Sequence, residues 1–209
     1  MGKIERGDID VDIAARQRQV VGNGPRIAPI PQDQFVGEPL QVCIDIRESI
    51  GVTDHSFIPE YMRTLGKHPK LLRRQMETGM TIFTGTIPPR ERELAILRIG
   101  WLMRAPYEWG EHVDISKRYG VTAEEVERAT HGSSAPGWSE HDRAIIAAVE
   151  ELIGDQAIAE ETWNTLARTW NEQQLIEFPT IVGQYVATAY VQNTLRMRLA
   201  SDNPGLSFR

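Results

Sequence analysis

The fold is decided by residues 89–104, PRERELAILRIGWLMR, and by residues 105–112, APYEWGEH, which follow directly. Pro89 is suited to the first turn of a helix, where its missing N–H would have no helical partner in any case. The positions after it are apolar almost all round, which indicates a central helix that is buried on every side. Pro106 then ends that helix or begins the next one.

Three ionisable side chains in this stretch form a candidate catalytic site. Glu93 lies on the apolar helix, and Glu108 and His112 follow four residues apart. Residues at i and i+4 share one face of a helix, so Glu108 and His112 can address the same small volume. A carboxylate and an imidazole beside apolar surface form a proton-transfer pair. One alternative is a surface ion pair between Glu108 and His112. The other is a structural ion pair between Glu93 and Arg90, Arg98 or a cation of another helix.

Helical signals continue through the rest of the chain. Apolar spacing, caps and Gly- or Pro-containing breaks predict further helices at about 40–50, 56–66, 69–83, 107–119, 122–130, 139–154, 160–170 and 172–199. Thr122 with Glu125 three residues later is a capping box. No alternating strand pattern of useful length occurs, so the sequence predicts an all-α fold, a helical bundle.

The N-terminal residues differ from the rest in composition. Residues 1–34 are polar, are interrupted by several Gly and Pro residues, and show no sustained hydrophobic period. This pattern is typical of an arm that wraps over a domain rather than of a core element. The sequence therefore predicts an extended arm over residues 1–34 and a single all-α domain over residues 35–209.

Composition limits the classes of function. The 209 residues are 41% hydrophobic and 25% charged, as in an ordinary soluble globular protein. A net charge of −6 argues against a nucleic-acid-binding surface, which needs clustered Lys and Arg. No apolar run approaches the roughly 20 residues of a membrane span, and the N-terminus lacks the apolar core of a secretory signal. We therefore expect a cytoplasmic protein with no membrane or nucleic-acid partner.

Cysteine and histidine usage narrows the possible cofactors. Cys43 is the only cysteine, so an intramolecular disulfide, a CxxC redox couple and a multi-cysteine zinc site are excluded. Its apolar neighbours predict a half-buried, unreactive thiol. No two histidines stand at metal-ligand spacing on one element. We therefore expect no metal and no other cofactor.

Several motifs resemble the carboxymuconolactone decarboxylase family, which includes the alkyl hydroperoxidase D proteins. The motifs are residues 89–98, then Tyr107-Glu108-Trp109-x-x-His112, and later residues 174–177 and 182–185. The resemblance extends over about 69–199. It implies a helical bundle of the alkyl hydroperoxidase D type and a symmetric homo-oligomer, to which helix 172–199 and the arm could supply contact surface.

The peroxidase branch of that family has a Glu, eleven residues, then Cys-x-x-Cys-x-x-x-His. Glu93 and His112 match the acid and the histidine, whereas Ala105 and Glu108 stand at the two cysteine positions. Thiol peroxidase chemistry needs a thiolate nucleophile and a resolving thiol. We therefore do not expect that activity, and a residual version would need Cys43 to lie within reach of His112.

The decarboxylase branch also lacks the cysteine pair, and there the resemblance implies cofactor-free acid–base chemistry on a small organic acid or lactone. His112 is the candidate acid/base, because its ordinary pKa of about 6.5 lies near working pH. Glu108 could orient or charge His112. Glu93 is a second acid/base candidate if burial raises its pKa.

Three further residues are candidates for substrate binding. Tyr107 could donate a hydrogen bond to a developing oxyanion, and Trp109 could form an apolar wall, unless both are packing residues. Arg98 could clamp a carboxylate, unless it forms a structural ion pair. The predicted function is a cofactor-independent lyase or isomerase acting on a small carboxylated or lactone-type compound. The alternative is a non-catalytic small-molecule binding or assembly protein on the same fold.

Overall fold

The computed structural model describes residues 11–49 and 52–209, and in these ranges the chain is helical with no strand. The helices are α1 (Ile13–Val20), α2 (Glu38–Ser49), α3 (Glu60–Leu65), α4 (Pro69–Phe83), α5 (Pro89–Leu102), α6 (Pro106–Arg118), α7 (Ala123–His131), α8 (Glu140–Asp155), α9 (Glu160–Leu166) and α10 (Glu172–Leu195), with the 3₁₀ turns η1 (Gln32–Gln34) and η2 (Gly205–Ser207). The all-α prediction is confirmed.

The helix starts follow the local signals in the sequence. Pro69, Pro89 and Pro106 each occupy the first turn of a helix. The capping box at Thr122 and Glu125 is present, with both reciprocal hydrogen bonds formed. The long last helix is shorter than predicted, because Arg196 adopts the left-handed conformation at φ 58° and ends α10 at Leu195.

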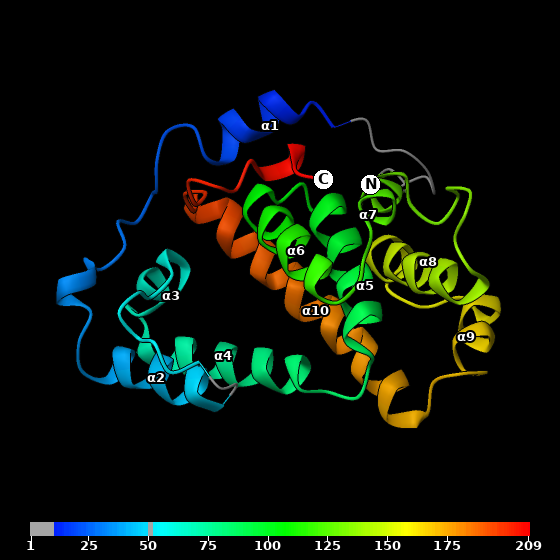
Figure 1. Cartoon of the computed structure of the whole chain (residues 1–209), viewed down its shortest axis with the longest axis horizontal. Helices are drawn as coiled ribbons and strands as arrows, with labels where there is room; N and C mark the ends of the chain where they lie inside the picture. Colours follow the sequence, from blue (N-terminus) through cyan, green and yellow to red (C-terminus); the bar gives the residue numbers. More distant parts are fainter. Residues whose placement is uncertain (1–10, 50–51) are drawn as a thin grey trace.

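Helix α5 lies at the centre of the molecule, with every residue from Arg92 to Trp101 buried. It packs against α6, α7, α8 and α10 (Figure 1). Helices α2, α3 and α4 form a second group on one side of α10, and α7, α8 and α9 lie on the other (Figure 1). Side chains from α5, α6 and α10 therefore meet in the interior, where polar groups need partners.

The N-terminal segment is only partly the extended arm that its composition predicted. Residues 13–20 form helix α1, which packs against α10 and η2. Asp12 caps this helix through the N–H of Ala15, and Val20 is buried. The apolar pattern was too weak to reveal the helix, because a single buried side chain and a cap hold it. Residues 1–10 of the predicted arm, and residues 50–51 at the predicted end of α2, lie outside the described ranges.

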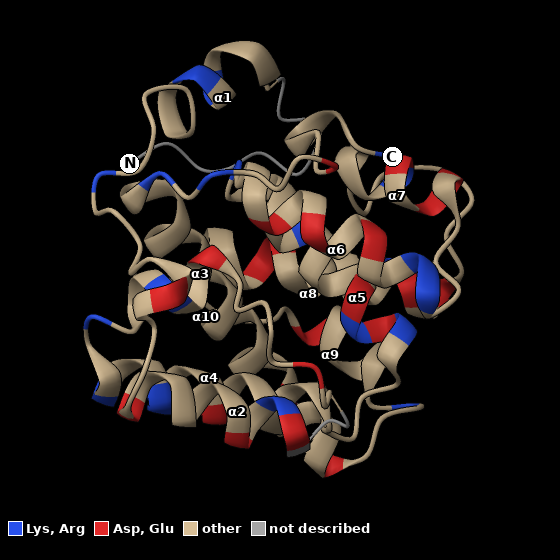
Figure 2. Cartoon of the chain, turned by 60° about the vertical axis from the view of Figure 1, so that its left-hand side comes forward, with Lys and Arg blue, Asp and Glu red and all other residues tan. Residues whose placement is uncertain are grey.

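Charged residues of both signs occur along the same helices, as on α2 and α4 (Figure 2). None of the described helices is both long enough and apolar enough to cross a membrane.

Candidate active site

Helices α5 and α6 approach each other closely next to the candidate site. A Cβ on Gly100 would lie 3.4 Å from the backbone of Trp109, so glycine permits this packing distance. The turn between the helices places Arg104 at a positive φ of 47° and returns the chain at Ala105. Glu93 on α5 and His112 on α6 are thereby brought into contact, although they are 19 residues apart.

The three predicted catalytic residues form one hydrogen-bonded chain. His112 Nδ1 lies 2.6 Å from Glu93 Oε2, and His112 Nε2 lies 3.1 Å from Glu108 Oε1. All three side chains are buried, with Glu93 0% exposed, Glu108 4% and His112 8%. The predicted i,i+4 contact between Glu108 and His112 is therefore present, but in the interior rather than on the surface. A buried imidazole between two carboxylates holds a proton in a fixed place.

Glu93 also pairs with its sequence neighbour. The guanidinium of Arg92 donates to Glu93 Oε1 from Nε and from one terminal nitrogen, at 3.2 and 3.1 Å. Its other terminal nitrogen donates to the carbonyl of Phe83 at 2.7 Å, and the group lies over the Phe83 ring. Arg92 was not among the predicted partners of Glu93, because adjacent residues on a helix do not normally face each other.

These contacts set the charges of the chain. Burial lowers the pKa of His112, but the charge of Glu93 and hydrogen bonds to Glu108 and Glu93 outweigh it and raise this pKa to about 10. Burial raises the pKa of Glu93, but His112 and Arg92 outweigh it and hold this pKa below its ordinary value. His112 is therefore an imidazolium at neutral pH, and the expectation of a histidine titrating near 6.5 was wrong.

Glu108 is held from its other side by α10. Gln192 Nε2 donates to Glu108 Oε2 at 2.5 Å, and Gln192 is 3% exposed. A carboxylate accepts hydrogen bonds, so it fixes which end of the amide faces it. Gln192 Oε1 then points elsewhere, is buried, and has no hydrogen-bond donor among the described residues.

Tyrosine rings surround the same chain. The ring of Tyr185 packs edge-on against His112, with centroids 5.2 Å apart. Tyr61 and Tyr107 pack against each other with centroids 6.5 Å apart. Burial, and then the negative charges of nearby glutamates, raise the pKa of all three hydroxyls. The hydroxyls stay protonated and can donate hydrogen bonds, as expected for Tyr107.

Two predicted substrate-binding residues have other partners. Trp109 is fully buried, its indole N–H donates to the carbonyl of Phe208 at 3.0 Å, and its ring packs on Trp101. Arg98 is 1% exposed, pairs with Glu150 at 2.8 Å and donates to two backbone carbonyls at the end of α7. Both were predicted as substrate contacts, with packing of Trp109 and a structural ion pair of Arg98 as the alternatives. In the structure their polar groups have the partners that these alternatives describe.

Cys43 is fully buried among the apolar side chains of α2, α3 and α4. Burial raises the pKa of its thiol to about 11, against a smaller opposite effect of Arg47. The thiol is therefore protonated at neutral pH, whereas a peroxidase needs a thiolate. Ala105, which stands at the first cysteine position of the peroxidase motif, is also buried.

The carboxylates of the site do not form a metal-binding arrangement. Glu93 and Glu108 bind opposite nitrogens of His112, so their oxygens do not converge on one point. Within residues 11–49 and 52–209, no group of three His, Cys, Asp or Glu side chains could hold a metal ion. The arrangement can move and hold a proton.

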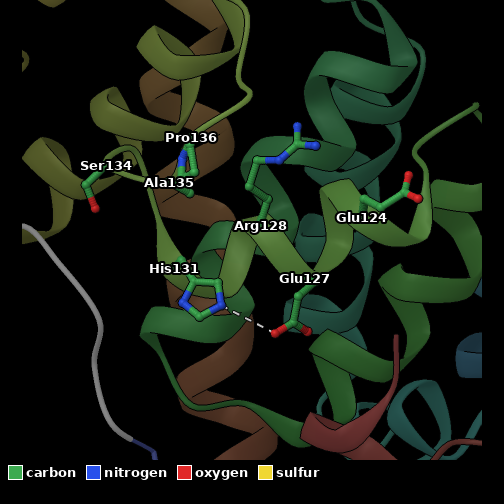
Figure 3. Close-up of a pocket in the computed structure, with 7 residues that line it drawn as sticks. All are labelled: Glu124, Glu127, Arg128, His131, Ser134, Ala135 and Pro136. Atoms are coloured by element: carbon green, nitrogen blue, oxygen red, sulfur yellow. Dashed lines mark ion pairs between the residues drawn. The ribbon is translucent and has the colours of Figure 1, made fainter.

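A cavity of about 560 Å³ lies apart from this chain, where α7 meets the loop before α8 (Figure 3). Figure 3 shows His131 beside Glu127, with an N–O distance of 3.4 Å, and Arg128 close by. Both partners of this ion pair are about half exposed, so solvent screens it. Exposed charges of this kind are a weaker basis for chemistry than the buried chain.

One family model and several solved structures are similar to this chain. Residues 69–151, which include Glu93, Glu108 and His112, match the model of the carboxymuconolactone decarboxylase family. Over this segment the chain is similar to that family. Curated proteins include no sequence match to the chain.

Several solved structures share the fold of this chain. A peroxidase-related protein from Ralstonia eutropha with an AhpD core has a TM-score of 0.69 and 15% identity, covering 84% of this chain and 93% of that one. The debrominase Bmp8, bound to 2,3,4-tribromopyrrole, has a TM-score of 0.68 and 18% identity, covering 85% and 93%. A peroxidase-related protein from Silicibacter sp. has a TM-score of 0.65 and 14% identity, covering 100% and 99%.

Three residues of the site were missed at the sequence level. Tyr185 lies in a segment that carries the family resemblance, so its position was a usable signal. Arg92 and Gln192 carry no such signal, because Arg92 adjoins its partner and Gln192 lies 84 residues from Glu108. Only the packing of α10 against α6 brings Gln192 to the site.

Proposed function

We propose that this chain is a cofactor-independent acid–base enzyme, a lyase or isomerase, acting on a small lactone-type or carboxylated compound. The observation that carries the proposal is the buried chain from Glu93 through His112 to Glu108. Glu108 is the end of that chain that meets the substrate, because Glu93 is fully enclosed by Arg92 and His112. It occupies the position of the second cysteine in the peroxidase motif.

The proposed chemistry uses this chain as a proton relay. In a decarboxylation, the bond between carbon and the carboxylate breaks, carbon dioxide leaves, and the electron pair enters a conjugated enolate. His112 Nε2 gives its proton to Glu108, and Glu108 gives that proton to the substrate carbon. Water then returns a proton to His112. The charges of Glu93 and Arg92 hold His112 in place throughout.

The charges of the site favour an uncharged group at Glu108. Arg92 and His112 are positive, and Glu93 and Glu108 are negative, so the four charges cancel. Arg98, the predicted carboxylate clamp, is engaged by Glu150. A substrate would therefore present a carbonyl or hydroxyl to this end, which Gln192 Oε1 and the tyrosine hydroxyls can bind.

The test is a turnover screen with carboxylated lactones and β-keto acids, following carbon dioxide release and ultraviolet absorbance. Glu108→Gln should lower turnover by about 10²- to 10⁴-fold, the usual contribution of a general acid or base. Glu111→Gln is the matched control, because this carboxylate is on the same helix but binds Asn203 at 3.0 Å. Full activity in Glu108→Gln would overturn the assignment.

One observation favours a second candidate, a non-catalytic small-molecule binding protein. With a pKa of about 10, His112 holds its proton tightly at neutral pH, which makes it a weak acid. Binding of panel compounds without turnover of any of them would support this candidate. Peroxide reduction is disfavoured, because Cys43 is a buried thiol and the motif cysteines are replaced.

Two expectations about partners also belong to this proposal. We expect the enzyme to act on small molecules without a nucleic-acid or membrane partner, in the cytoplasm. We also expect a homo-oligomer, which sedimentation equilibrium would test.

A further inference from the structure

An apolar cleft of about 410 Å³ lies between α3, α4 and α10. Leu65, Val191 and Leu195 line it, together with Leu71 and Tyr190, which are 47% and 60% exposed. Its volume is within the range of small-molecule sites, about 300–1,000 Å³, and such sites are mostly apolar. Exposed apolar side chains gathered at a cleft are a feature of ligand-binding grooves.

A hydrogen-bonded cluster lies beside this cleft in the interior. Gln75 Nε2 donates to the hydroxyl of Tyr61 and lies 3.4 Å from the hydroxyl of Thr188. These three residues come from α4, α3 and α10, the helices that form the cleft. Each lies about one helical turn from a residue that lines the cleft. The pairs are Tyr61 with Leu65, Gln75 with Leu71, and Thr188 with Val191.

In all three helices the step of one turn from the cluster residue to the cleft residue leads in the same direction. On α3 and α4 the step leads towards residues 66–68, which join these two helices. The cleft residue follows its partner on α3 and α10 but precedes it on α4. Helix α4 runs from left to right in Figure 1, whereas α10 runs from the lower right to the upper left. A step towards the N-terminus of α4 is therefore a step towards the C-terminus of α10. The cluster consequently lies at one end of the cleft, about 5 Å of helix rise away.

The cluster also adjoins Glu108. Tyr61 packs on Tyr107, which precedes Glu108 in α6. Burial and then the negative charge of Glu108 raise the pKa of Tyr61, as expected of groups that lie close together. The order in space is therefore cleft, then Tyr61 with its partners, then Glu108 with His112.

We propose that this cleft binds the apolar body of the substrate and directs its uncharged end past Tyr61 to Glu108. This inference rests on the proposed function. Lys67 lines the opposite, exposed rim of the cleft and supplies a positive charge there. The ligand class is accordingly a small apolar ring system with a carboxylate at the end remote from Glu108. This carboxylate stays on the molecule, and for this ligand class the reaction at Glu108 is the proton transfer of an isomerase.

The test measures binding of 2-naphthoate, a fluorescent carboxylate of this class, to variants of the full chain. Leu71→Asp places a charge in the cleft, and should weaken binding at least about tenfold. An acidic residue in the first turn of α4 is compatible with the helix, so the variant should fold. Ile176→Asp is the matched control, because Ile176 is also an apolar residue, 72% exposed, but does not line the cleft.

A second arm tests the carboxylate end. Lys67→Met should weaken binding of 2-naphthoate several-fold and leave binding of the uncharged 2-naphthamide unchanged. Equal effects of Leu71→Asp and Ile176→Asp, or no binding of 2-naphthoate to the wild type at millimolar concentration, would overturn the inference. So would a loss of oligomer mass in Leu71→Asp by sedimentation, which would make the cleft a contact between copies of the chain.

The two proposals fail in different ways. Binding at the cleft with no turnover of any compound would contradict the proposed function and leave the cleft as a ligand site. Turnover that is lost in Glu108→Gln but unchanged in Leu71→Asp would contradict this inference and leave the proposed function standing.

Discussion

The pH dependence of stability offers a direct measure of the buried proton on His112. Its pKa is about 10 in the folded chain, against an ordinary 6.5. A folded-state pKa above the unfolded value stabilises the protein fully below about pH 6.5, and the stabilisation is lost as pH rises towards 10. At about 1.4 kcal/mol per pKa unit, the complete effect is on the order of 5 kcal/mol.

The interval from pH 6.5 to 8.5 isolates this effect. Cys43, with its pKa raised to about 11, and the tyrosines, with raised pKa values, lose protons at higher pH. Over these two pH units, proton linkage at His112 should lower the free energy of unfolding by about 2 kcal/mol. The comparison is Glu93→Gln/His112→Gln, which removes the histidine together with its buried carboxylate partner and should show no such decrease.

The assay is urea unfolding followed by circular dichroism at pH 6.5, 7.5 and 8.5 and constant ionic strength. All other histidines are shared by the two proteins, so the difference between their pH profiles reports His112 alone. Parallel profiles would refute the reasoning, because they would mean that His112 titrates alike in the folded and unfolded chain.

Two further substitutions and one labelling experiment probe other parts of the molecule. Gln192→Leu should lower the free energy of unfolding by about 1–3 kcal/mol in urea titrations, because it removes the buried amide that donates to Glu108 Oε2; an unchanged midpoint would contradict the contact. Gly132→Ala should lower the thermal midpoint markedly, since φ is 86° and the new Cβ would lie 2.4 Å from the Arg98 guanidinium; a wild-type midpoint would show that this loop can move. Cys43 should react with a thiol reagent only as fast as the protein unfolds, and rapid labelling of the native protein would show that the thiol is accessible.

Local signals in the sequence predicted most of the fold. Prolines at helix starts and the Thr122 capping box act within one turn, so they work in the same way in the sequence and in the structure. The apolar run after Pro89 predicted the central helix correctly, because a helix that is apolar all round has to be buried. Helix α1 was missed, since it is held by contacts with α10 and η2 rather than by its own pattern.

The site was predictable only as far as helical spacing extends. The contact between Glu108 and His112 follows from their spacing on α6. The raised pKa of His112 does not follow from helical spacing, because this pKa depends on Glu93, which contacts His112 from another helix. The structural role of Arg98 could not be predicted from helical spacing either, because its partner Glu150 lies 52 residues away. Distant residues decide whether a charged side chain is free to act.

The most direct test of the central claim is the protonation state of His112 in the folded chain. Side-chain nitrogen-15 NMR between pH 6 and 10.5, assigned with His112→Gln, would observe it without any substrate. We expect an imidazolium with both ring nitrogens protonated at pH 8, bonded to Glu93 and Glu108 and titrating near pH 10. A neutral imidazole at pH 8, titrating near 6.5, would contradict the proton relay.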